Sequence, residues 1–147
     1  MSTETNKQNF RRIPMDVFNK GNVALLNEIV ASDYIEHVPP APGWPTGIEG
    51  LKQFVTMLRK SFPDLTYTLD DTIGEGDMAA GQATVRGTHL GELPSPMGMI
   101  PPTGKQATWT EMHIGRYANG KLVEHWAEVD TLGMMQQLGL ATAPGQA

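Results

Sequence analysis

The sequence predicts an α+β domain in which helices come first and a run of antiparallel strands follows. Up to Phe62 apolar residues recur at helical spacing, whereas beyond Pro63 they alternate with polar residues, as in strands with one buried face. The strands are linked by short turns and not by helices, which is typical of α+β proteins and argues against a doubly wound nucleotide-binding fold. The 147 residues suit one domain.

Three helical segments are predicted before the strands begin. Residues 10–18 have helical spacing but contain Pro14, which interrupts backbone hydrogen bonding, so this helix kinks or restarts there. Residues 25–30 form a short amphipathic helix after a glycine stop at Gly21. The clearest helix carries an apolar stripe of Ile48, Leu51, Phe54, Val55, Leu58 and Phe62.

The remaining predicted elements are extended or irregular. Extended segments are predicted at residues 33–38, 65–70, 78–89, 106–117 and 122–130, with one or two helical turns at 134–140. The proline-rich stretches 39–47 and 91–104 are predicted loops. We therefore expect a single domain at residues 10–140, between a flexible N-terminus (1–9) and a flexible tail (141–147).

Composition and charge exclude several classes of partner and site. The 16 acidic residues outnumber the 11 basic ones, so we expect no binding to nucleic acid or to anionic membranes. The absence of cysteine excludes disulfides and thiolate ligands. No apolar run approaches the roughly 20 residues of a membrane span, and the first residues lack an apolar signal core. We expect a cytoplasmic protein.

Histidines and neighbouring acids carry the candidate chemistry. In the strand predicted at 106–117, side chains two residues apart share a face, so Trp109, Glu111 and His113 lie together. A histidine exchanges protons near neutral pH, and an adjacent carboxylate fixes its tautomer. Glu111 and His113 are therefore a candidate acid/base pair, and the same pattern also fits a solvated surface pair.

The hairpin turn at Asn119-Gly120 decides which residues join this pair. A two-residue turn places His113 opposite Trp126. A three-residue turn that includes the preceding alanine places His113 opposite His125 and on the same face as Ala127. Both turns accept Asn-Gly, so these residues alone leave the choice open.

Further candidates lie in loops and at strand ends. His37 follows Glu36 in an extended segment, and His89 ends a strand; each also fits an ordinary structural histidine. Apolar side chains in irregular loops cover a core or the mouth of a pocket. The loops contribute three such candidates: Trp44, Met97 and Ile100. Because no HxH or HxxxH pair occurs, no metal site is predicted.

Short motifs occur along the chain in a distinctive order. They are Tyr34-Ile-Glu-His37, Gly47-Ile-Glu-Gly-Leu51, Gly87-Thr-His-Leu-Gly91, Met99-Ile-Pro-Pro-Thr-Gly104 and HIGRYANGKLVEHW at residues 113–126. Together they resemble the SnoaL-like polyketide and ester cyclases of the nuclear transport factor 2-like superfamily, over residues 10–139. The resemblance implies a cone, in which a curved antiparallel sheet wraps around helices and encloses an apolar pocket.

The resemblance also implies a chemistry. Cyclases of this family close a polyketide ring by intramolecular aldol condensation without metal or cofactor, using an aspartate as general acid/base with help from a histidine. By resemblance the histidine is His113, whereas the aspartate position is Ala127, which cannot transfer a proton. The resemblance favours the three-residue turn, because Glu111 and His125 then stand beside Ala127 and can replace the missing acid.

The leading hypothesis is a cofactor-independent acid/base enzyme that acts on a mid-sized, mostly apolar carbonyl compound. In it His113 is the general base or acid, oriented by Glu111, and His37 or His125 is the complementary proton donor. The substrate-binding candidates are Glu36, Trp44, His89, Met97, Ile100, Trp109 and Ala127. The alternatives on the same fold are a non-catalytic small-molecule-binding protein and a hydratase, dehydratase or epoxide-opening hydrolase.

Self-association is also predicted. With the three-residue turn, Met112, Ile114 and Trp126 face outward, and an apolar outer face indicates a partner. Cones of this family often pair through that face, so we expect a homodimer or a larger homo-oligomer.

Overall fold

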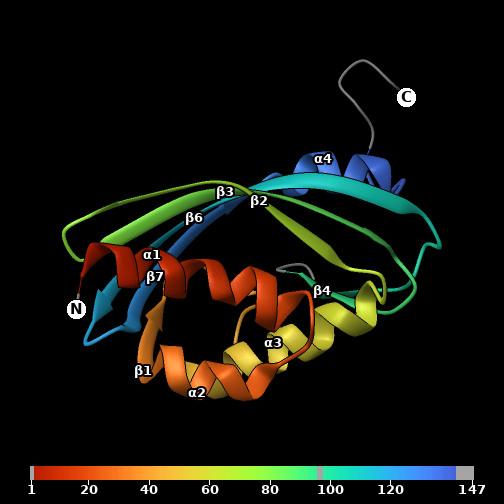
Figure 1. Ribbon diagram of the computed structural model, residues 1–147. Coiled ribbons are helices and arrows are strands. Elements are labelled where there is room, and N and C mark those ends of the chain that lie inside the picture. The colour runs from red at the N-terminus through yellow and green to blue at the C-terminus, as the bar shows by residue number, and fades with distance from the viewer. Residues whose placement is uncertain (1, 96–97, 142–147) are drawn as a thin grey trace.

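The computed structural model describes residues 2–95 and 98–141 and has the predicted α+β fold (Figure 1). The elements in chain order are α1 (Thr3–Arg12), a π-helical segment (Ile13–Phe18), a 3₁₀ turn (Val23–Leu25), α2 (Leu26–Ile29), β1 (Val30–Glu36), α3 (Gly47–Ser61), β2 (Thr66–Glu75), β3 (Met78–Thr88), β4 (Leu93–Ser95), β5 (Gly98–Ile100), β6 (Gln106–Ala118), β7 (Lys121–Val129) and α4 (Thr131–Gln137). Figure 1 shows the long strands bowing over α1, α2 and α3. Within the described residues, no helix is long and apolar enough to cross a membrane.

The N-terminal segment corrects one prediction. Residues 3–9, expected to be flexible, belong to α1, and the Ser2 hydroxyl caps this helix by accepting a hydrogen bond from the Thr5 backbone N–H at 3.1 Å. The segment is polar because only one side of α1 packs on the sheet, where Phe10 is buried. The α-helix ends at Arg12, just before Pro14, and the chain continues as the π-helical segment, where the prediction was a kink or a restart. Of the expected flexible tail, residues 142–147 lie outside the described residues.

The sheet is mixed and not wholly antiparallel, in the order β1-β7-β6-β3-β2. The four later strands pair antiparallel as predicted, whereas β1 pairs in parallel with β7 and places Glu36 beside His125. The run of hairpins gave no sign of this pairing, because β1 lies before α3 in the chain and joins the far edge of the sheet. The parallel pair completes one wall of the concave face.

Two glycines in β3 let the helices approach the sheet. A Cβ at Gly81 would lie 2.8 Å from Cε1 of Phe10, and one at Gly87 would lie 2.8 Å from Cβ of Phe62. Phe62 follows α3 and is fully buried. The glycines therefore weaken β3 as an isolated strand, but they allow the aromatic side chains of the core to pack directly on its backbone.

The loop predicted at residues 91–104 contains structure. Its first part forms the short antiparallel hairpin of β4 and β5, in which Leu93 pairs with Ile100. Leu93 is buried and Ile100 packs against the core, so the apolar side chains of this stretch anchor it.

The hairpin between β6 and β7 combines a two-residue turn with a bulge, a geometry that differs from both predicted alternatives. The turn has two residues, Asn119 and Gly120, both at positive φ (52° and 77°), so the predicted three-residue turn is wrong. A bulge at Val123 then shifts the register, and His113 stands opposite Ala127. The bulge restores the face expected from the longer turn, with His113, His125 and Ala127 on the concave side.

Candidate active site

A cavity of about 1200 Å³ lies against the concave face of the sheet. Most of its walls come from β1, β6, β7, α3 and the two proline-rich stretches, and α1, the π-helical segment, β2, β3 and α4 complete them. It is lined by eight of the candidates: Glu36, Trp44, Ile100, Trp109, Glu111, His113, His125 and Ala127. These eight candidates come from separate elements and border the same cavity.

The loop before α3 forms part of the cavity wall and is fixed to that helix. The Trp44 indole N–H donates to the Gly50 carbonyl at 2.9 Å, and the Trp44 ring meets the Phe54 ring edge-on, with centroids 6.4 Å apart. Trp44 is thus an anchored part of the lining and not a free surface side chain.

The charged side chains of the lining are acidic. Among the described residues, the lining contains no lysine or arginine. Its carboxylates are those of Asp33, Glu36, Glu111 and Glu128. An anionic ligand would meet no lysine or arginine in the described part of this wall and would be repelled by its four carboxylates, so the cavity suits a neutral compound.

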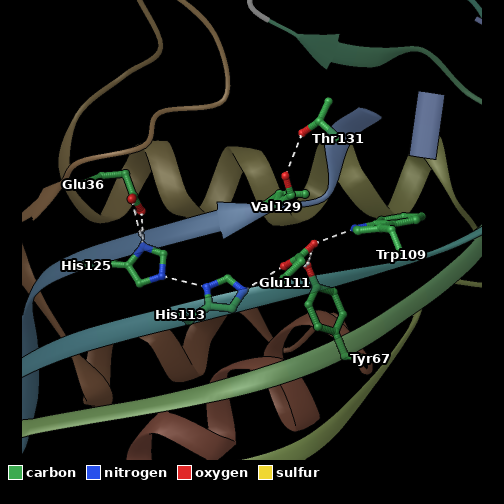
Figure 2. A network of polar contacts seen from close by, with 8 residues as sticks. All are labelled: Glu36, Tyr67, Trp109, Glu111, His113, His125, Val129 and Thr131. Atoms are coloured by element: carbon green, nitrogen blue, oxygen red, sulfur yellow. Dashed lines mark hydrogen bonds and ion pairs between the residues drawn. The ribbon is translucent and has the colours of Figure 1, made fainter. Parts of the chain in front are cut away.

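A continuous chain of polar contacts crosses the wall (Figure 2). Both carboxylate oxygens of Glu36 lie 2.8 Å from Nδ1 of His125. Nε2 of His125 lies 2.9 Å from Nδ1 of His113, and Nε2 of His113 lies 2.8 Å from Oε1 of Glu111. The two imidazole planes differ by only 22° with centroids 5.1 Å apart, so the rings meet edge to edge with their nitrogens aligned.

The Glu111 end of the chain is the more deeply buried. Glu111 is only 6% exposed, and its Oε2 accepts a hydrogen bond from the Trp109 indole N–H at 2.8 Å. The Tyr67 hydroxyl lies 3.3 and 3.4 Å from the two carboxylate oxygens. Burial, reinforced by the Glu111 charge, raises the pKa of Tyr67, so its hydroxyl stays a donor at neutral pH.

The Glu36 end mirrors this arrangement. The Tyr34 hydroxyl donates to Glu36 at 3.3 Å, and the backbone N–H of Val38 donates at 3.2 Å. Burial, and then the neighbouring Glu36 carboxylate, raise the pKa of Tyr34. Each carboxylate is therefore held by a histidine, a tyrosine that keeps its proton and one further N–H.

His113 contacts Glu111, the residue predicted to orient it, and its catalytic role stays a prediction. Both ring nitrogens of His113 and both of His125 are engaged by protein groups, which leaves neither ring a free nitrogen for a ligand. A carboxylate offers about four acceptor positions. Glu111 meets the donors of His113, Tyr67 and Trp109, so it retains about one position for a ligand.

Two predicted site histidines lie elsewhere. His37 is outside the cavity lining; its Nε2 contacts Glu124 at 2.7 Å and its ring stacks on Trp126 with centroids 4.8 Å apart. The bond from His37, with Arg116 adding to it, lowers the pKa of Glu124. The adjacent Glu36, unlike His37, lines the concave site.

His89 is also outside the lining and fully buried in the core. Its Nδ1 lies 3.0 Å from the Thr103 hydroxyl and its ring packs against Phe62, so it fixes the stretch that carries β4 and β5. Met97, the remaining candidate, lies outside the described residues. Within the part of the chain that is described, no group of three or more histidine and acidic side chains is arranged to hold a metal ion.

Sequence reasoning missed the two tyrosines. Tyr34 had an available signal, since it precedes Glu36 by two residues on one strand and so shares its face. Tyr67 lies on β2 and reaches Glu111 on β6 across the intervening β3. That contact depends on sheet order and curvature, for which the sequence near Tyr67 contains no signal.

Comparisons with known proteins agree with this architecture. The family model described as SnoaL-like polyketide cyclase matches residues 8–138. The chain is 28% identical over 126 residues to nogalonic acid methyl ester cyclase of Streptomyces nogalater, covering 85% of this chain and 91% of that protein. It is 27% identical over 131 residues to aklanonic acid methyl ester cyclase DauD of Streptomyces sp. strain C5, covering 85% and 76%.

Solved structures of similar proteins have the same fold as this chain. TsrD from Streptomyces laurentii superposes with a TM-score of 0.84 at 26% identity, covering 96% of this chain and 99% of that one. IdmH from Streptomyces antibioticus superposes with a TM-score of 0.76 at 33% identity, covering 91% and 98%.

Proposed function

The chain belongs to the SnoaL-like polyketide cyclase family, and on this premise we propose that it is a cofactor-independent acid/base enzyme that closes a ring in a mid-sized, mostly apolar carbonyl compound. The position of the Glu111 carboxylate supports this most strongly. The carboxylate is buried, lines the cavity and retains an acceptor position. A carboxylate removed from water in this way is a typical general base.

In the proposed reaction Glu111 takes a proton from a carbon next to a carbonyl group. The electron pair of that C–H bond forms an enolate, whose carbon bonds to a second carbonyl carbon of the same molecule. The oxygen of that second carbonyl takes the proton back from Glu111. One proton moves from carbon to oxygen and no atom is lost, so substrate and product are isomers.

Glu111 in this proposal replaces the aspartate that the resemblance assigns to Ala127. Ala127 stands opposite His113 and lines the cavity, so its small side chain leaves space beside the polar chain. Glu111 lies two residues from His113 on the same face of β6. His113, predicted to act on the substrate directly, becomes a residue that positions Glu111.

Neutral methyl esters are the proposed substrate class. The carboxylates of the lining have no lysine or arginine among the described lining residues to offset them, which disfavours a free acid. The two curated relatives are named as cyclases of nogalonic and aklanonic acid methyl esters. The esterified carboxyl group of such compounds carries no charge.

Incubation of the purified protein with each of these two methyl esters tests the proposal. Chromatography with mass detection should show a product of unchanged mass, and Glu111→Gln should lower its rate by about 10²–10⁴. A product heavier or lighter by one water would support the hydratase, hydrolase or dehydratase alternatives instead. Ester binding without any product would support the binding-protein alternative and overturn the cyclase proposal.

A further inference from the structure

The polar chain across the site has a carboxylate at each end and two imidazoles between them. Its three internal contacts are Glu36 to His125, His125 to His113, and His113 to Glu111, at 2.8, 2.9 and 2.8 Å. At these separations each contact is a hydrogen bond, and each hydrogen bond requires one proton between its two heavy atoms. The chain therefore needs three bridging protons.

The two histidines alone do not supply that number as neutral rings. When both carboxylates are ionised, His125 must donate from Nδ1 to Glu36, and His113 must donate from Nε2 to Glu111. These two protons are all that two neutral imidazoles carry. The facing pair, Nε2 of His125 and Nδ1 of His113, would then be two lone pairs at 2.9 Å. A third proton between them removes that repulsion.

We propose that Glu36 is a positioning residue that makes this chain store one additional proton, so that His125 and His113 share a single imidazolium charge next to Glu111. The role in ring closure rests on the proposed function; the stored proton itself does not. Glu36 is suited to this role because it accepts only, whereas a neutral amide in its place both accepts and donates.

The neighbouring tyrosines do not change this count. Tyr34 donates to Glu36 and Tyr67 lies within hydrogen-bond distance of Glu111, and both keep their protons because burial raises their pKa values. Their hydroxyl protons point to the carboxylates and not into the line of the two imidazoles. The backbone N–H of Val38 and the indole N–H of Trp109 are permanent donors in the same way.

The stored proton has a chemical use in the proposed reaction. When Glu111 takes the C–H proton, negative charge appears on the enolate in the cavity. The shared imidazolium is one hydrogen bond away from Glu111, while its counter-charge on Glu36 lies at the far end of the chain. This arrangement directs a fixed positive charge at the developing anion, which is the usual way in which sites stabilise enolates and alkoxides.

The substitution Glu36→Gln tests for the stored proton, because it removes the need for it. The glutamine amide can donate to Nδ1 of His125, which then donates from Nε2 to His113, which donates from Nε2 to Glu111. All three contacts are then satisfied by two neutral rings. The polar chain keeps the same net charge, because the variant loses one negative carboxylate and one bridging proton together.

Nitrogen-15 NMR of histidine-labelled protein at neutral pH counts these protons, since bare and protonated ring nitrogens resonate far apart. In the wild type, three of the four nitrogens of His113 and His125 should be protonated, with the third proton shared by the two facing nitrogens. Glu36→Gln should lower the count to two. Glu111→Gln, at the other end of the polar chain, should also lower the count to two. It is the substitute test if the Glu36→Gln variant does not fold. The control Glu124→Gln, whose partner His37 lies on the outer face, should leave the count at three.

Two protons in the wild type, or an unchanged count in a folded Glu36→Gln variant, would overturn the inference. Turnover of an accepted ester adds a second readout, in which Glu36→Gln should lower kcat by about 10²-fold with KM nearly unchanged. A loss expressed in KM alone would indicate a substrate-binding role for Glu36 and overturn the positioning role. If neither ester reacts while three protons are found, the proposed function fails and the stored proton stands.

Discussion

Replacing His113 by alanine cuts the polar chain at its centre. The substitution removes the 2.8 Å bond to Glu111 and the 2.9 Å bond to His125. A net contribution of about 1 kcal/mol per bond, and somewhat more for the charged one, gives a loss of about 1–3 kcal/mol in the free energy of unfolding. The loss stays in this range because Glu111 keeps Tyr67 and Trp109 as hydrogen-bond donors.

The effect of the same substitution on turnover should be larger than its effect on stability. Without His113, Glu111 loses the group that orients it and its link to the imidazolium. We expect kcat to fall by at least about 10²-fold, equivalent to roughly 3 kcal/mol. Urea unfolding measures the first quantity, and conversion of an accepted methyl ester measures the second.

His37→Ala is the matched control for His113→Ala. His37 also bonds a glutamate, Glu124 at 2.7 Å, but on the outer face of the sheet and with 38% of its side chain exposed. Its removal should cost no more than about 1 kcal/mol and should leave turnover unchanged. Two results would refute the assignment of the chemistry to the polar chain on the concave face. One is a turnover of His113→Ala within twofold of the wild type, and the other is a loss of turnover in His37→Ala as large as that in His113→Ala.

Three further predictions concern assembly and stability. On the outer sheet face Met112 is 60% exposed and Ile114 is 42% exposed. Sedimentation should therefore show a dimer or a larger oligomer at micromolar concentration, and Met112→Glu should shift the protein toward monomer. A monomeric wild type would contradict this prediction. Burial lowers the pKa of His89 below its ordinary value near 6.5, so the unfolded chain binds this proton first. The free energy of unfolding should therefore fall as the pH drops through about 6.5, and His89→Phe should flatten this part of the urea-derived profile. Phe62→Ala, at a fully buried site, should cost about 3–5 kcal/mol in the same assay, and a loss below about 1 kcal/mol would mean that the core rearranges freely around it.

Local patterns predicted the elements that depend on neighbouring residues. The apolar stripe gave α3, and the alternation in β6 placed Trp109, Glu111 and His113 on one face, as observed. The interruption at Pro14 followed from the missing backbone donor. In each case the physical cause lies within a few residues of its effect.

The errors arose where distant segments decide the outcome. Residues 3–9 are polar, and they are helical because α1 packs on β2 and β3. The face of β7 depended on a bulge at Val123, since the turn alone would have placed His125 on the other side. Glu36, and not His37, faces the site because β1 joins β7 in parallel, and nothing near residue 36 specifies that partner.

The parallel pairing of β1 with β7 also bears on how the molecule matures. Glu36 and His125 are 89 residues apart in the sequence, so this link of the polar chain forms only after a long loop has closed. Such long-range closures are slow compared with hairpin formation. A polypeptide that ends before β7 would contain α3 and the β2–β3 hairpin but would lack the polar chain, so the proposed active site is assembled only when β7 pairs with β1.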